Sequence, residues 1–409
     1  MHIPHLRLQP LALRLLCISG LFGLSVGLSN TFVNIFIWKV DESFVAIALY
    51  NIGAYFLMPI AFTLAGYISN YLHTAWALRI GVILHIAFYS IVLFIGERAA
   101  VFPYLLGALI GLAGGFYWFS FNMLSLSYTE SGKRDGFFSF NGVVNALAGM
   151  IAPPLSGLLI SYEDRFGGLT GYHVIFGISL ALFFVGGWLS MKLSAKKLSH
   201  PLCLQKAFSA LHKREWRLTM AASAVYGLRE GVFIFLISLL MYISTGSEMK
   251  LGNFLLLQGG LSFVSFFIVG KLANEQNRIK ILAFGAVGMA LAATLFLIPM
   301  SSKIILWYGA SIAVALPFFL IPLQTYVFDG ISRLENETGQ RAEHVIVREV
   351  FSNTGRVIGI MAFLMLVILD ADKNAIAKFA VGLGFVQLFA FILLRYRKVQ
   401  ASSDTESAA

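Results

Sequence analysis

The sequence predicts an all-α polytopic membrane protein with 12 transmembrane helices, arranged as two pseudo-symmetric six-helix bundles. Of its 409 residues, 58% are hydrophobic and 12% are charged, and the mean hydropathy is +0.80. A membrane-spanning helix needs about 20 predominantly apolar residues, and twelve such runs lie between charged or turn-rich breaks. Long apolar runs such as 232–241, which only Ser238 interrupts, disfavour a β-barrel, whose strands alternate apolar and polar residues.

The twelve apolar runs give the expected helices in order. In the first half they span 11–37, 44–69, 77–96, 101–127, 137–161 and 172–191. In the second half they span 218–243, 251–272, 280–299, 304–330, 349–369 and 375–394. The breaks between them are charged or turn-rich, and residues 333–348 form one that reads as a loop. The most basic break lies near the middle of the chain. We therefore expect an N-terminal bundle at 1–191, a basic cytoplasmic linker at 192–217, a C-terminal bundle at 218–394 and a polar cytoplasmic tail at 395–409.

The positive charges predict the orientation, because cytoplasmic loops carry an excess of Lys and Arg. Of the 30 Lys and Arg residues, 22 fall on the side of the termini and the central linker, and seven fall on the other side. Arg229, near the middle of the seventh run, is counted on neither side. We expect a multi-pass protein of the cytoplasmic membrane with both termini inside. The dispersed charge also explains the net charge of +10 without a nucleic-acid partner.

A short pattern repeats at equivalent places in the two halves. Gly66-Tyr-Ile-Ser-Asn70 follows the second run, and Gly270-Lys-Leu-Ala-Asn274 follows the eighth. With the six-plus-six layout and the basic central linker, this pattern makes the chain resemble the major facilitator superfamily of secondary transporters. In that family an acid follows the glycine, and a basic cluster comes next. Here Asn70 and Asn274 replace the acid, and only Arg79 or Arg278 and Lys280 follow.

The fifth run carries a second partial match to this family. Gly149, Pro153, Pro154 and Gly157 resemble the glycine-proline motif of its exporting members. The simpler interpretation is a kinked packing face, since small residues let helices approach closely and proline bends them. The fourth run lacks the arginine that drug-proton exporters tend to carry.

The seventh run has a polar face. At 100° per residue, Thr219, Ser223, Tyr226 and Glu230 fall within about 60° of one another. An unpaired charge at this depth would cost roughly 3 kcal/mol or more. Glu230 is therefore expected to be ion-paired, with Arg229 as one candidate, or protonated, or in contact with water. A structural pair and a direct role with substrate or proton both stay open.

Other polar side chains are candidates for a solute pathway. The resemblance implies that the first, fourth, seventh and tenth helices surround a central cavity, so it adds weight to six residues: Asn34, Tyr117, Trp118, Asn122, Glu230 and Gln324. For each amide the alternative is an ordinary hydrogen bond between helices.

Charged and polar residues at the expected cytoplasmic ends are candidates for a gate, although charges that merely reach for the interface are common at helix ends. The candidate gate residues are Asn70, Arg79, Asn274, Asp329, Arg333, Arg348, Glu349 and Arg356.

No motif for catalysis or cofactor binding is present. The eight histidines lack metal-ligand spacing, His85 reads as a packed residue, and no phosphate-binding glycine loop occurs. We expect a monomeric secondary transporter of a small solute in the lipid bilayer, without cofactor or metal. Proton-coupled export of amphipathic compounds is favoured over nutrient uptake by symport. A scaffold, sensor or lipid enzyme is the competing class.

Overall fold

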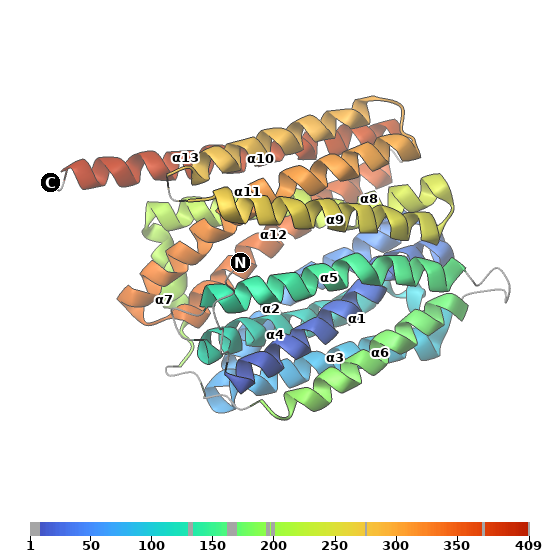
Figure 1. The fold of residues 1–409 in the computed structure, drawn as a ribbon, viewed down its shortest axis with the longest axis horizontal. Coiled ribbons are helices and arrows are strands. Elements are labelled where there is room, and N and C mark those ends of the chain that lie inside the picture. The colour runs from blue at the N-terminus through green and yellow to red at the C-terminus, as the bar shows by residue number, and fades with distance from the viewer. Residues whose placement is uncertain are drawn as a thin grey trace. The chain divides into compact units, whose positions relative to one another are not determined.

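The computed structural model describes residues 9–129, 134–161, 170–193, 197, 201–274, 276–369 and 373–407, and no strand occurs among them (Figure 1). The first half of the chain forms α1 (Pro10–Asp41), α2 (Phe44–Tyr71), α3 (Thr74–Ile95), η1 (Gly96–Val101), α4 (Pro103–Tyr128), α5 (Arg134–Ser161) and α6 (Thr170–Ser190). The second half forms α7 (Leu204–Ser209), η3 (Ala210–His212), α8 (Arg214–Thr245), α9 (Glu248–Leu272), α10 (Arg278–Ala293), η4 (Thr294–Leu297), α11 (Ser302–Thr338), α12 (Arg341–Leu369) and α13 (Lys373–Ser407).

Within the described ranges, twelve helices are long and apolar enough to cross a membrane. They correspond one to one with the twelve apolar runs, so the predicted fold class is confirmed. Local chemistry fixes several ends: Ser43 accepts hydrogen bonds from the backbone N–H groups of Val45 and Ala46 at the start of α2, and Ser301 caps α11 in the same way.

The chain divides into two compact units. Unit 1 comprises Met1–Leu202 and Gly246–Leu256, and unit 2 comprises Cys203–Thr245 and Leu257–Ala409. In unit 1, α1 packs on α5 and α6, and α3 packs on α4 and α6. In unit 2, α8 packs on α12 and α13, and α10 packs on α11 and α13. These pairs are equivalent in a duplicated six-helix unit, which matches the repeat in the sequence.

Two predicted irregular segments contain helix instead. The break at 333–348 is reduced to a turn, because α11 continues to Thr338 and α12 begins at Arg341. The predicted linker includes α7 and the start of α8, and its alanines Ala207 and Ala210 are buried. Charged helix formers end an apolar run without ending a helix, and the same reason lets α13 continue through the predicted polar tail to Ser407.

Candidate functional site

In unit 2, α8 and α12 lie in backbone contact at mid-length. A Cβ atom on Gly227 would lie 2.3 Å from Ser352 O, and one on Gly231 would lie 2.6 Å from Arg356 O. Across the contact, a Cβ atom on Gly355 would lie 1.9 Å from Ala224 O. Glycines on both helices thus permit an approach that larger residues would prevent. Polar side chains beside these glycines are consequently brought together.

Glu230 of α8 and Arg356 of α12 form an ion pair at this contact. Arg356 Nε and Nη2 each lie 2.7 Å from Glu230 Oε2. The Tyr226 hydroxyl, one turn away on α8, donates to Glu230 Oε1 at 3.3 Å. The pair is partly accessible, since 24% of the Glu230 side chain and 18% of the Arg356 side chain are exposed. It is a charge-assisted, doubly hydrogen-bonded pair near the midpoint of both helices.

The polar contacts continue from this ion pair along α12. Arg356 Nη1 donates to Asn353 Oδ1 at 2.9 Å. Asn353 Nδ2 in turn donates to the backbone and side-chain oxygens of Glu349, and Glu349 is paired with Arg348. One connected polar chain therefore runs through Tyr226, Glu230, Arg356, Asn353, Glu349 and Arg348. Asn353 and Glu349 in this chain are buried.

The sequence predicts Arg356 at the cytoplasmic end of a span, whereas in the structure it lies near the middle of α12. It is the sixteenth residue of the 29-residue helix α12, and its partner is an acid at mid-span. Without it, the charge count for orientation becomes 21 to seven, which leaves the predicted orientation unchanged. The sequence does carry a signal that these residues lie together. Glu349, Asn353 and Arg356 are spaced by four and three residues, which places them on one face of a helix.

Arg229, the candidate partner of Glu230, points elsewhere. Its Nη2 donates to the Tyr308 hydroxyl of α11 at 2.9 Å, and its guanidinium lies 4.5 Å from the centre of the Phe233 ring. Only 4% of the residue is exposed, and its Nε has no hydrogen-bond partner in the described part of the chain. Arg229 therefore links α8 to α11, and sequence reasoning did not identify Tyr308.

The predicted pathway residues of α4 differ in exposure. Tyr117 is fully buried and stacks on Phe22, with ring centres 3.5 Å apart. Trp118 and Asn122 are partly exposed, and Trp118 meets Phe22 and Tyr117 edge-on. Tyr117 thus belongs to the aromatic core of unit 1, whereas Trp118 and Asn122 remain available to a solute.

The amides on the other helices also separate into two kinds. Asn34 of α1 is buried and accepts a hydrogen bond from Asn51 Nδ2 of α2 at 2.9 Å. This is the ordinary hydrogen bond between helices that was the alternative to a role in the solute pathway. Gln324 of α11 is exposed. Of the three predicted pathway amides, Gln324 and Asn122 therefore keep the exposure that solute contact requires.

Two of the candidate gate residues, Arg79 and Asn274, make local hydrogen bonds. Arg79 of α3 donates to the backbone oxygens of Ser190, Met191 and Leu193 at the end of α6. Asn274 Oδ1 accepts from the backbone N–H groups of Gln276 and Asn277, which closes the turn before α10. Asn70 lies at the end of α2.

The remaining gate candidates form ion pairs inside unit 2. Arg278 Nη1 lies 2.8 Å from Asp329 Oδ2, and Arg333 Nη1 lies 2.9 Å from Glu215 Oε2. Glu215 was missed by sequence reasoning, because an acid at a helix start gives no indication of its partner. Asp329 and Arg333 thus stabilise the end of unit 2 to which they belong.

The glycine-proline segment of α5 packs against the start of α9, which belongs to the same unit. A Cβ atom on Gly157 would lie 2.5 Å from Glu248 O, and one on Gly252 would lie 2.8 Å from Pro153 O. Nothing lies within 4 Å of a Cβ atom on Gly149. Pro154 is part of the Gly252 contact as well. The segment therefore acts as a packing face at Gly157 and Pro153, and not at Gly149.

A polar cluster adjoins this packing face. Glu248 Oε1 lies 2.6 Å from Lys39 Nζ and accepts a hydrogen bond of 3.1 Å from the Tyr172 hydroxyl. Lys39 Nζ also lies 5.0 Å from the centre of the Tyr172 ring. Sequence reasoning counted Lys39 only as a loop charge. The ion pair joins α1 to the start of α9 within unit 1.

We expect Gly157→Ala to destabilise the protein, because the new methyl group meets a backbone oxygen. Overpacking of this kind costs typically about 1–3 kcal/mol, so the melting temperature of the purified protein should fall. Gly149→Ala is the matched control and should leave stability unchanged or slightly raised, since alanine is the better helix former. Equal melting temperatures for the two variants would contradict the close packing.

In the described ranges, no group of three or more His, Cys, Asp or Glu side chains could hold a metal ion. His85 Nδ1 lies 2.7 Å from Gly81 O, and its ring stacks on Phe183. The His85 side chain is therefore packed against an aromatic ring and hydrogen-bonded to the backbone of its own helix.

Comparison with known proteins gives the family. Residues 15–365 match the family model of the Major Facilitator Superfamily. The chain belongs to this superfamily. The transporter is also 37% identical over 397 residues to "Uncharacterized protein YqgE" of Bacillus subtilis, a match covering 96% of this chain and 91% of that protein.

Solved structures of transporters share the fold. A mutant of the nucleoside transporter NupG gives a TM-score of 0.70 at 14% identity, over 94% of this chain and 99% of that chain. The Escherichia coli fucose:proton symporter FucP gives 0.64 at 15% identity, over 94% and 98%. The resemblance seen in the sequence is confirmed, and this superfamily member is a multi-pass membrane transporter by family and fold.

Proposed function

We propose that the protein is a proton-coupled secondary transporter that moves a small solute across the cytoplasmic membrane by alternating access. The observation that carries this proposal is the pair of Glu230 with Arg356. Glu230 is the acid farthest from a helix end among the described helices. Ionisable residues at membrane depth are costly and commonly serve ion pathways or proton relays. Partial exposure of both side chains allows a proton to reach the pair.

The geometry supports a specific coupling step. A proton bound at Glu230 Oε2 would neutralise the carboxylate that holds Arg356 Nε and Nη2. Arg356 would keep its hydrogen bond to Asn353, while the Tyr226 hydroxyl would remain beside Glu230 Oε1. Because α8 and α12 are in backbone contact here, loss of the ion pair changes how strongly the two helices are held together. Proton binding is thereby linked to the conformation of unit 2.

The candidates for solute contact are the partly exposed Trp118 and Asn122 of α4 in unit 1 and the exposed Gln324 of α11 in unit 2. The aromatic ring of Trp118 and the amide of Asn122, four residues apart on α4, suit an amphipathic compound that has both an apolar body and polar groups. We favour export of such a compound in exchange for protons. Uptake by proton symport is the second candidate, since the structural neighbour FucP is a fucose:proton symporter.

Proton flux in proteoliposomes tests the proposal. Amphipathic compounds that raise the melting temperature of the purified protein are first selected. Each is then added to liposomes that contain the protein and a trapped pH indicator. A transported compound should move protons, and the sign of the pH change distinguishes exchange from symport. Solute flux that is independent of any pH gradient and moves no protons would refute proton coupling.

The orientation can be tested by cysteine labelling. In a background with Cys17 and Cys203 replaced by Ser, a cysteine at the exposed Ser209 should react with a membrane-impermeant reagent only after the cells are opened. Lys303→Cys, at the exposed start of α11, should react in intact cells, because the charge asymmetry predicts that this end of α11 lies outside. The reverse labelling pattern would overturn the predicted orientation.

A further inference from the structure

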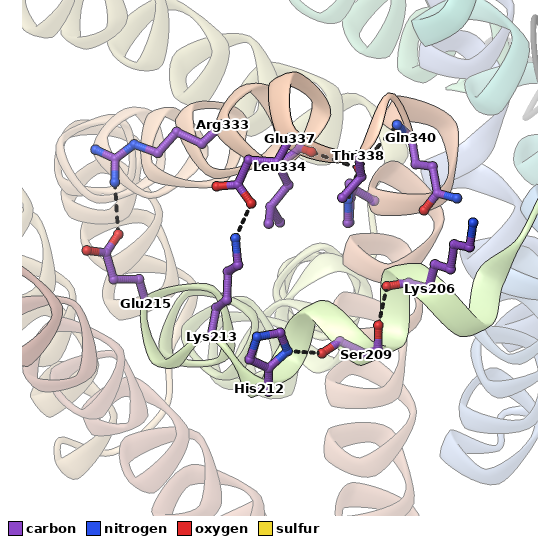
Figure 2. A network of polar contacts seen from close by, with 11 residues as sticks. Lys206, Ser209, His212, Lys213, Glu215, Arg333, Leu334, Glu337, Thr338 and Gln340 are labelled. Atoms are coloured by element: carbon purple, nitrogen blue, oxygen red, sulfur yellow. Dashed lines mark hydrogen bonds and ion pairs between the residues drawn. The ribbon is translucent and has the colours of Figure 1, made fainter.

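Unit 2 contains a cavity at the end where α8 begins and α11 ends. Its volume is about 360 Å³, which falls within the range of small-ligand pockets. Nine residues line it: Lys213, Arg214, Glu215, Trp216, Gly330, Arg333, Leu334, Glu337 and Arg397. Figure 2 shows two of its ion pairs, Arg333 with Glu215 and Lys213 with Glu337, each joining the start of α8 to α11.

The cavity has an excess of positive charge. Four cationic side chains line it, Lys213, Arg214, Arg333 and Arg397, against the two carboxylates of Glu215 and Glu337. Glu215 is shared, because Arg397 Nη2 lies 3.7 Å from the same Oε2 atom that Arg333 contacts at 2.9 Å. The ion pairs within the cavity therefore leave positive charge uncompensated, which favours an anionic ligand.

Two buried donors of the lining lack partners. Arg397 is only 6% exposed, yet its Nη1 has no hydrogen-bond partner in the described part of the chain, and the same holds for Trp216 Nε1. The Arg397 guanidinium is fixed over the Tyr326 ring, with its Cζ atom 4.9 Å from the ring centre. The Trp216 ring is fixed against Gly330, where a Cβ atom would lie 2.9 Å from ring carbons. Buried donors are normally satisfied, and both of these belong to residues that line the cavity, so both are available to donate to a bound acceptor.

We propose that this cavity binds a phosphate group carried by an organic molecule, held by Arg397 and Arg333. A phosphate offers several acceptor oxygens, and the guanidinium fork matches its geometry. A cavity of about 360 Å³ leaves room for an organic group such as glycerol. The phosphate comes from either of two sources, the headgroup of an anionic lipid or a soluble organic phosphate. Basic pockets between transmembrane helices bind anionic headgroups, and Trp is common at the membrane interface. The site is independent of the Glu230–Arg356 ion pair.

Binding to the purified full-length protein tests the site. Melting temperatures are measured in neutral detergent at constant ionic strength, with two phosphate probes and one control lipid. The probes are sn-glycerol 3-phosphate and short-chain phosphatidylglycerol in mixed micelles, and the control is phosphatidylcholine. A saturable rise in melting temperature with either probe supports the site. A response to glycerol phosphate identifies a soluble source, and a response to phosphatidylglycerol alone identifies the lipid. No response to either probe would overturn the proposal.

Matched variants localise the binding. Arg397→Gln is expected to raise the apparent dissociation constant about 10-fold, the effect of losing about 1.4 kcal/mol. Arg217→Gln removes the same charge from an exposed position on α8 that does not line the cavity, and it should bind like the wild type. Should Arg397→Gln fail to fold, Arg333→Gln provides a second variant. The Arg333 side chain is 65% exposed, so its replacement disturbs the fold less. Equal weakening by Arg217→Gln would mean general charge attraction and would refute the site.

Discussion

Glu230→Gln is expected to abolish solute flux driven by a pH gradient while leaving solute binding intact. Glutamine has the shape of the acid and still accepts a hydrogen bond from Arg356 Nε, so the protein should still fold with α8 against α12, although the two helices are held less strongly than by the ion pair. It cannot take up and release a proton, and the coupling step is lost. Flux should be measured in proteoliposomes with and without a pH gradient, alongside solute exchange at equal pH, which should persist.

The control for this variant is Glu335→Gln. Glu335 is an acid of unit 2 that is ion-paired with Arg341 near the end of α11. Its replacement makes the same chemical change outside the Glu230 network and should leave gradient-driven flux unchanged. Wild-type dependence on the pH gradient in Glu230→Gln would rule out Glu230 as the coupling group, and equal loss in both variants would indicate a general effect of removing an acid.

The helices could be predicted because bilayer thickness fixes the length of an apolar run. The run at 44–69, for example, became α2, Phe44–Tyr71. Hydropathy reports where a helix leaves the membrane and does not report where the helix ends. It failed for this reason at α11, which continues as helix through Arg333, Glu335 and Glu337 to Thr338.

The polar face of α8 was also predictable, because helical periodicity places Tyr226 and Glu230 together, and they are hydrogen-bonded. The partner of Glu230 was not found. Arg356 lies 126 residues away on another helix, and periodicity within one helix gives no information about its neighbour. The available signal was the spacing of four residues between Gly227 and Gly231 and between Gly355 and Gly359, which marks the contact of α8 with α12.

The same limit explains why the buried pathway candidates could be distinguished from the exposed ones only in the structure. Tyr117 and Trp118 are adjacent in sequence, but Tyr117 stacks on Phe22 in the core while Trp118 stays partly exposed. A residue's depth along the membrane follows from its position in a run. Its exposure depends on which neighbouring helix covers it, and a single sequence does not specify this.

A double-mutant cycle on Glu230 and Arg356 is expected to give a large coupling energy. Breaking a buried ion pair costs about 3–5 kcal/mol, whereas exposed pairs contribute about 1 kcal/mol or less. This pair is partly exposed, so we expect each single change, Glu230→Gln or Arg356→Gln, to cost about 2 kcal/mol, between those limits. The double variant should recover most of that loss, because neither charge is then left without its partner. The cycle requires the unfolding free energies, measured in mixed micelles, of the wild type, the two single variants and the double variant.

Arg229→Gln combined with Glu230→Gln provides the discriminating control. Arg229 contacts Tyr308 and Phe233 rather than Glu230, so its change should destabilise the protein by loosening α8 from α11. The effects of these two changes should be closer to additive than those of Glu230→Gln and Arg356→Gln, since Arg229 and Glu230 make their side-chain hydrogen bonds with different helices. If Arg229→Gln instead rescued Glu230→Gln while Arg356→Gln and Glu230→Gln were additive, the neighbouring arginine would be the true counter-ion. The polar chain from Tyr226 to Arg348 would then be broken at Glu230, and the proposed link between proton binding and the contact of α8 with α12 would fail with it.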